Sequence, residues 1–184
     1  TVDAERIREL RALGFNRLSL GIQDFYEPVQ KAVNRAQSPE EVQALVDSAR
    51  EAGFGSISFD LIYGLPLQTV ETFNKTLDIA IAMKPDRQAV YHYAHLPERF
   101  KGQRMINSDD IPSPETKLDL LHHTIDKLCG AGYIYIGMDH FALPDDELVL
   151  ARENGTLQRN FPGYSTHRQC DLVSLGVSGI GGIG

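Results

Sequence analysis

The chain has 184 residues, of which 42% are hydrophobic and 23% are charged, and its formal net charge is −7. This length predicts one globular domain or a part of a larger one. The acidic balance argues against nucleic-acid binding, and the longest uncharged stretch, residues 172–184, is too short and too rich in glycine to cross a membrane.

The chain contains four segments with one shared pattern, an amphipathic helix followed by a stop signal and a short strand. They span residues 7–23, 42–64, 77–96 and 118–141. A recurring helix and strand predicts βα units. Because helices join the successive strands, we expect parallel pairing with right-handed crossovers, in the fourth unit as in the others.

Helix boundaries are marked by specific residues. The run Ser-Pro-Glu-Glu at 38–41 is a capping box with proline in the first turn, and Gly53 can end that helix in a left-handed conformation. Thr69 and Ser113 are expected to cap two further helices. The apolar stripe of the last helix is predicted from Leu118, Leu121, Ile125 and Leu128.

Two of the strands alternate between large apolar and small polar residues. In the first strand Leu18, Leu20 and Ile22 oppose Ser19, Gly21 and Gln23, and in the second Ile57, Phe59 and Leu61 oppose Ser56, Ser58 and Asp60. Strands of a parallel sheet are usually apolar on both faces. We therefore expect the apolar set to face the helices and the polar set to face an open interior that holds a ligand.

Polar residues occur where the strands are expected to end. These are Gln23 with Asp24, Asp60, residues 92–95, and Asp139 with His140. Ligand sites of such folds lie at the carboxyl ends of the strands, so this common rim predicts a binding site. The alternative is that polar residues stand there because the chain meets solvent.

Four βα units cannot close a (β/α)8 barrel, which takes about 250 residues. An unclosed barrel leaves strand edges that need covering. The predicted fold class is therefore α/β, a partial and open TIM-like barrel with parallel strands inside and helices outside. Residues 95–112, with a proline near each end, are expected to be an excursion between units, and the chain to be a fragment of a longer enzyme.

Individual residues each allow a functional and a structural interpretation. Asp60 could accept hydrogen bonds from a ribose diol, or be a structural carboxylate. Arg35 offers a fork for a carboxylate, or is a solvated surface arginine. His92, Asp139 and His140 could hold a divalent metal in a hydrolase, although strand geometry points His92 and His95 to opposite faces. His140 is otherwise a proton carrier, a substrate ligand or a buried histidine.

Several segments together carry a family resemblance. They are GIQDF at 21–25, Asn-Arg at 34–35, FDLIYGLPLQT at 59–69, YAHLP at 93–97, GMDHFALPDDEL at 137–148 and LGVSGI at 175–180. In this order they resemble oxygen-independent coproporphyrinogen III oxidase, a radical S-adenosylmethionine (SAM) enzyme of haem biosynthesis. The similarity runs from about Leu10 to Ile180, nearly the whole chain.

The resemblance implies an open radical SAM barrel, two SAM molecules and a [4Fe–4S] cluster. It implies oxidative decarboxylation of two propionates of coproporphyrinogen III, an electron-donor protein as partner, and a cytoplasmic location without nucleic acid or membrane. Residues 1–112 would be the back half of the barrel, and residues 113–184 the last helix–strand unit with the start of a C-terminal region.

The site residues follow from the matching positions. Gln23, Arg35, Asp60 and Ala94 match the family's positions around one SAM, and Ile180 matches a contact to the other. Ala94 and Ile180 come from the resemblance alone, since their contacts would be apolar or through the backbone.

The sequence also departs from the family pattern. The three-cysteine motif CxxxCxxC is absent, Cys129 and Cys170 match no motif, and no metal ligand is assigned. Leu143 stands where a basic residue is expected. The N-terminal cluster-binding part is thus expected to be missing and the fragment alone to be inactive. The alternative is a non-catalytic haem- or tetrapyrrole-binding or trafficking relative.

Overall fold

The helices begin and end where local chemistry satisfies their free backbone groups. In the computed structural model, which describes residues 3–160, 163–167, 170–177 and 179–182, the capping box of Ser38 and Glu41 opens α3 (Pro39–Ala52). Gly53 ends this helix with a φ of 85°, in the left-handed region. These boundaries confirm the expectation from the sequence.

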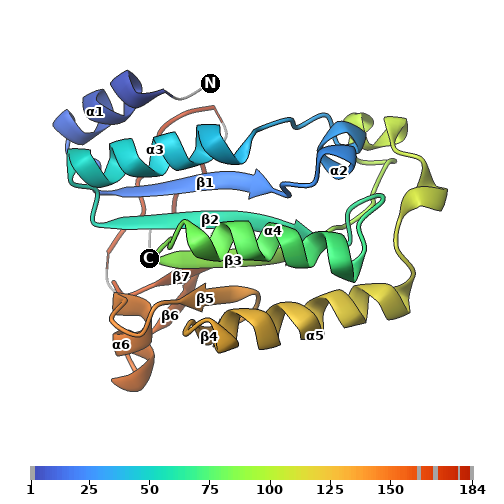
Figure 1. The fold of residues 1–184 in the computed structure, drawn as a ribbon. Helices are drawn as coiled ribbons and strands as arrows, with labels where there is room; N and C mark the ends of the chain where they lie inside the picture. Colours follow the sequence, from blue (N-terminus) through green and yellow to red (C-terminus); the bar gives the residue numbers. More distant parts are fainter. Residues whose placement is uncertain (1–2, 161–162, 168–169, 178, 183–184) are drawn as a thin grey trace. The chain divides into compact units, whose positions relative to one another are not determined.

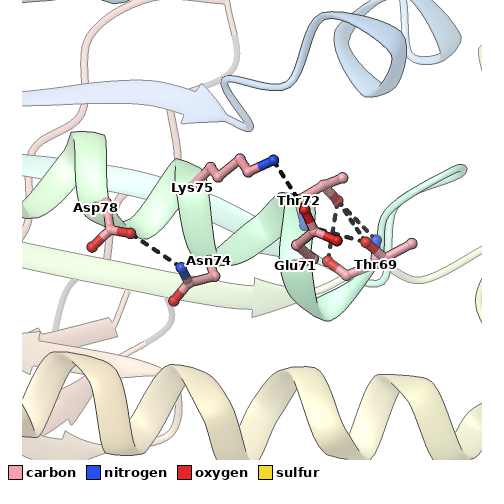
Figure 2. Close-up of polar contacts among 6 residues, drawn as sticks. All are labelled: Thr69, Glu71, Thr72, Asn74, Lys75 and Asp78. Atoms are coloured by element: carbon pink, nitrogen blue, oxygen red, sulfur yellow. Dashed lines mark hydrogen bonds and ion pairs between the residues drawn. The ribbon is translucent and has the colours of Figure 1, made fainter.

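Threonine and serine caps start the next two long helices. Thr69 caps α4 (Val70–Ala82) by accepting from the backbone N–H of Thr72, and Ser113 caps α5 (Pro114–Gly130) in the same way. Figure 2 shows the cap of α4 together with two pairs one turn apart on the helix, Glu71 with Lys75 and Asn74 with Asp78. Such pairs stabilise a helix only slightly.

The sheet has five strands in the order β1-β2-β3-β5-β4. The first three, β1 (Arg17–Gln23), β2 (Ser56–Tyr63) and β3 (Arg87–His92), pair in parallel, as expected. Figure 1 shows α3 and α4 running alongside them. The short helices α1 (Ala4–Ala12) and α2 (Glu27–Ala32) flank the first strand in the chain.

The expected fourth parallel strand is wrong. The chain instead forms a hairpin of β4 (Ile134–Gly137) and β5 (His140–Ala142), and β5 pairs antiparallel with both β4 and β3. Met138 and Asp139 make the two-residue turn, with φ of 40° and 71°. Two-residue turns with positive φ at both positions usually contain asparagine–glycine or aspartate–glycine, and this sequence has neither pair at 138–139.

The two faces of the sheet differ as the alternation predicts. Along β2 the odd-numbered residues from Ile57 to Tyr63 are buried, whereas Ser58 and Asp60 on the other face are partly exposed. The buried set joins helical residues such as Val46, Phe73 and Leu128 in one core. The prediction for Leu118 is wrong, because its side chain is 53% exposed. Leu128 is buried as predicted, and Leu121 and Ile125 pack partly buried against the core. Leu120 and Thr124 are buried as well.

The chain divides into two compact units, Thr1–Leu143 and Pro144–Gly184. The second contains α6 (Glu147–Glu153), the hairpin of β6 (Gln158–Asn160) and β7 (Gly163–Ser165), and a bridge between Leu172 and Gly182. The division expected after residue 112 stays a prediction. Among the residues described, none of the helices is both long and apolar enough to span a bilayer.

Candidate functional site

A cavity lies where the parallel strands end. Figure 1 shows α2 and the segment after β3, with its 3₁₀ helices η1 (Lys101–Met105) and η2 (Ser108–Asp110), near the carboxyl ends of β1 and β2. The cavity measures about 650 Å³, within the range of small-molecule sites. Its lining includes Gln23, Arg35, Ile62, Tyr93, Gln103 and Met105.

Gln23 reaches this cavity because β1 ends irregularly. The register with β2 shifts between Gly21 and Gln23, and Gln23 has a φ of 67°. A positive φ is uncommon for a residue with a side chain and is often found at functional sites. The next backbone N–H, of Asp24, bonds back to the carbonyl of Ile22 at 2.9 Å. This tight turn directs the chain away from the sheet at the rim.

Arg35 reaches the same cavity from the turn after α2. Asn34 adopts a φ of 53°, and the guanidinium Nη2 of Arg35 donates to the carbonyl of Gly21 at 3.1 Å. A Cβ on Gly21 would lie 2.9 Å from Gln23 Nε2 and 3.2 Å from Arg35 Nη2. A larger residue at this position would therefore displace the ends of these two side chains from the strand, and glycine leaves room for them.

Asp60 lies on the open face of the sheet, opposite Gly21 in the register. Its Oδ2 accepts the hydroxyl of Ser19 at 2.9 Å. Burial raises the pKa of the Asp60 carboxyl, and the Ser19 hydrogen bond and then the nearby His140 act against that rise. Oδ1 of Asp60 makes no hydrogen bond within the described residues and can accept one from a ligand.

Ala94 follows β3 and is exposed. Its carbonyl accepts Nε2 of Gln103 at 3.0 Å, and Oε1 of Gln103 accepts the N–H of Leu96 at 2.5 Å. One amide side chain thus holds the backbone on both sides of His95. Neither Gln103 nor Ser19 was singled out from the sequence. Ser19 was placed on the correct face, but its partner depends on the register between two strands.

A buried polar group supports the rim from behind. Asp24, whose exposed fraction is 1%, accepts the backbone N–H of Tyr26, the hydroxyl of Thr76 and Nε2 of Gln68, each at 2.6 Å. Burial raises the pKa of Asp24 against the effect of these donors. Oε1 of Gln68 in turn accepts the N–H of Gly64. The group links the ends of β1 and β2 to α4.

His92 ends the parallel strand β3 as expected, but the expected rim positions of Asp139 and His140 are wrong. Asp139 lies in the hairpin turn, and His140 begins β5 opposite Ala89, so neither ends a parallel strand. The ring of His140 also hydrogen-bonds through Nδ1 to the carbonyl of Met138 at 2.7 Å. Throughout the described ranges, no group of three or more histidine, cysteine or acidic residues is arranged to hold a metal ion.

Ile180 belongs to the second unit and is half exposed there, with its carbonyl accepting the hydroxyl of Ser174 at 2.5 Å. The two cysteines, Cys129 and Cys170, are exposed and free and lie in different units. They do not fit an iron–sulfur cluster, which takes several neighbouring thiolates. No residue of this chain is therefore assigned to such a cluster.

The donor set at the rim suits a polar ligand with both a carboxylate and a hydroxyl pair. Arg35 supplies a fork for a carboxylate, Gln23 an amide, and Asp60 an acceptor beside the glycine of β1. SAM has these groups, and the glycine close to both side chains leaves room for a ligand against the strand. The residues present therefore fit SAM.

Comparison with known proteins gives a consistent result. Residues 1–80 match the model of the radical SAM superfamily. The chain is 63% identical over 175 residues to the oxygen-independent coproporphyrinogen III oxidase of Pseudomonas aeruginosa, covering 95% of this chain and 38% of that protein. It is 52% identical over 183 residues to the enzyme of the same name from Escherichia coli, covering 100% of this chain and 40% of that protein.

A solved structure agrees in fold as well. The crystal structure of coproporphyrinogen III oxidase from Escherichia coli, described as a radical SAM enzyme, superposes with a TM-score of 0.94 and 52% identity. The match covers 99% of this chain and 42% of that chain. The chain therefore spans about two fifths of the length of the curated relatives that it matches.

Proposed function

This chain belongs to the oxygen-independent coproporphyrinogen III oxidases, within the radical SAM superfamily. We propose that it forms the SAM-binding part of an enzyme acting on coproporphyrinogen III. In that reaction two propionate side chains each lose carbon dioxide, one hydrogen atom and one electron, and become vinyl groups. The product is protoporphyrinogen IX, an intermediate of haem biosynthesis. The proposed enzyme receives electrons from a donor protein and works in the cytoplasm.

The residues of the rim have separate tasks in binding. Arg35 pairs with the methionine carboxylate of SAM, and Oδ1 of Asp60 accepts from the ribose. Gln23 and the backbone of Ala94 close the site from either side, and Ile180 contacts a second SAM. Bound SAM, together with a cluster held outside this chain, supplies the hydrogen-abstracting radical of the superfamily.

The observation that supports this function best is the cavity that gathers Gln23 and Arg35 at the strand ends, beside Asp60 on the open face. Gln23 and Arg35, each in a segment resembling the family, line this cavity at the edge where ligands of such folds bind. Asp60 lies within β2, opposite Gly21, rather than at the strand end expected from the sequence.

The test is SAM binding by the full-length protein that contains this sequence, prepared without oxygen. Arg35→Ala removes a charge-assisted contact, which is worth about 1.5–3 kcal/mol, so the Kd for SAM rises about tenfold or more. The control is Arg6→Ala, which removes an exposed arginine paired with Glu9 on α1 and leaves the Kd unchanged. Equal affinity of Arg35→Ala and wild type would overturn the assignment.

The second candidate, a tetrapyrrole-binding or trafficking relative, is distinguished in the same preparation. A binding protein shifts the Soret band of added haem but forms no protoporphyrinogen IX from coproporphyrinogen III with SAM and a reductant. Full-length protein that contains no iron–sulfur cluster and does not decarboxylate would favour it. The identity of 52–63% to oxidases favours the enzyme.

A further inference from the structure

Cationic side chains gather beside the cavity in one short segment. Residues 96–106, which we call the rim segment, follow β3 and contain Arg99, Lys101 and Arg104 but one carboxylate, Glu98. All three cations are exposed. In a chain with a net charge of −7, this local excess of positive charge is a feature that the binding of SAM does not use.

The 3₁₀ helix η1 places the cations and the cavity-lining residues of the rim segment on different faces. A 3₁₀ helix has three residues per turn, so Lys101 and Arg104 stand one above the other. The neighbouring positions Gly102, Gln103 and Met105 line the cavity. The two cations are therefore beside the mouth of the cavity and not inside it. Aligned like charges repel each other, and an anionic ligand relieves that repulsion.

Of these cations Arg104 is held in place by a side-chain hydrogen bond, and all three have unused hydrogen-bonding capacity. Nε of Arg104 donates to the carbonyl of Pro97 at 3.0 Å, and Gln103 ties the segment to Ala94. Within the part of the chain that the structure describes, the terminal guanidinium nitrogens of Arg104 make no hydrogen bond. Arg99 and Lys101 likewise make no ion pair with a described residue.

Two exposed apolar side chains are sequence neighbours of the cations. Phe100 is 56% exposed and Met105 is 89% exposed, and both border the cavity. Large apolar side chains exposed beside a pocket are typical of binding surfaces. A ligand that matches the rim segment thus has an apolar body and several carboxylates.

We propose that Arg99, Lys101 and Arg104 bind propionate carboxylates of coproporphyrinogen III, while Phe100 and Met105 contact its macrocycle. The substrate has four propionates around an apolar ring system, and the positive charge of the rim segment complements it. SAM then occupies the cavity and the substrate lies over its mouth. This inference rests on the proposed function and adds to it the residues that select a polycarboxylate tetrapyrrole.

The experiment measures the KM for coproporphyrinogen III in the full-length protein, with dithionite as the reductant. A small reductant removes the need for an electron-donor protein, whose docking could also use a basic surface. The main variant is the double substitution Arg99→Gln with Lys101→Gln, because neither side chain supports the fold through a hydrogen bond or ion pair. Its KM rises about tenfold, from about threefold for each lost charge contact, while the Kd for SAM stays unchanged.

Two further variants make the result specific. Replacing Arg99 and Arg104 by lysine keeps the charge, so the KM stays within about threefold of wild type. The matched control is Lys75→Gln, which removes an exposed lysine from α4 (Figure 2) and does not alter the KM. Higher ionic strength raises the KM of the wild type more than that of the double variant, since salt screens the lost contacts.

The outcomes separate this inference from the proposed function. If the wild type does not convert coproporphyrinogen III at all, the proposed function fails. If the wild type converts it and the double variant has the same KM, the assignment of the rim segment is wrong. An effect seen with a protein donor but not with dithionite would overturn the substrate assignment and assign the surface to the donor.

Discussion

The pKa of the Asp60 carboxyl depends on its burial and on one neighbouring hydroxyl. Ser19 holds Oδ2 of Asp60 from the neighbouring strand, and this bond counteracts the rise in pKa that burial causes. A raised pKa means that the proton is held more tightly, so Asp60 loses its charge at a higher pH than an exposed aspartate does. If Asp60 accepts from the ribose of SAM as proposed, the ionised form is the better acceptor, and we expect affinity to fall as the pH falls through this pKa.

Replacing Ser19 by alanine is expected to move that pH dependence. Without the hydroxyl the pKa of Asp60 rises further, so the pH at which half of the SAM affinity is lost moves upward, and affinity returns toward wild type at alkaline pH. Titration of SAM binding against pH in the full-length protein checks this. The control is Ser58→Ala, opposite Ser19 in the register. An unshifted profile in Ser19→Ala would contradict the role of this bond.

Several elements meet at Asp24. The carboxylate receives donors from the segment after β1, from the turn after β2 and from α4, so three elements are fixed by one buried group. The hydroxyl of Thr76 also accepts the backbone N–H of Phe25 at 3.1 Å. Burying a carboxylate is unfavourable unless such bonds compensate for its lost hydration. The position of Gln23 beside it depends on the whole group.

Thr76→Val keeps the shape of the side chain and removes both bonds. The free energy of unfolding falls by about 1–3 kcal/mol at neutral pH. The loss shrinks toward pH 4, because the pKa of Asp24 is raised in the folded protein and the protonated carboxyl depends less on the hydroxyl. Urea unfolding of wild type and variant across this range measures it. Thr124→Val, at a buried threonine that bonds within its own helix, should show a loss independent of pH.

At the scale of elements, the sequence predicts helix ends well, because local chemistry determines them. Ser38, Gly53, Thr69 and Ser113 mark helix ends because their side chains or backbone angles satisfy nearby groups. The β4–β5 hairpin was not predictable, because Met138 and Asp139 adopt left-handed angles without the usual residues. Leu118 was misplaced because spacing along a helix allows more than one apolar stripe.

At the scale of the whole molecule, the alternation of polar and apolar residues predicted the sheet's two faces correctly. The alternation could not predict the order of the strands in the sheet. It therefore could not predict that His140 of β5 pairs with Ala89, the residue that also pairs with Asp60. Gln23 and Asp60 were accessible from the pattern, whereas Ala94 depends on the family resemblance alone, because its exposed backbone has no side-chain signature. The role of Gln103 requires the path of the rim segment.

The placement of the two cysteines leads to a prediction for the full-length protein. Cys129 and Cys170 are exposed, and they belong to different units. Replacing both by serine should leave the iron content and the rate of coproporphyrinogen III conversion unchanged, because the cluster ligands are expected elsewhere in the polypeptide. Iron analysis after anaerobic purification measures this. A loss of iron in the double variant would show that one of them is a ligand.

The strand order has a consequence for folding. β1 and β2 each pair with the next strand along the chain, whereas β3 pairs with β5, which lies between β3 and β4. A hairpin closes within microseconds, so β4 and β5 are expected to associate first and dock onto β3 afterwards as a preformed ribbon. During synthesis the N-terminal layer can assemble before that ribbon leaves the ribosome. The histidine that moderates Asp60 therefore arrives last, and the interior acquires its final charge balance only when the ribbon has docked.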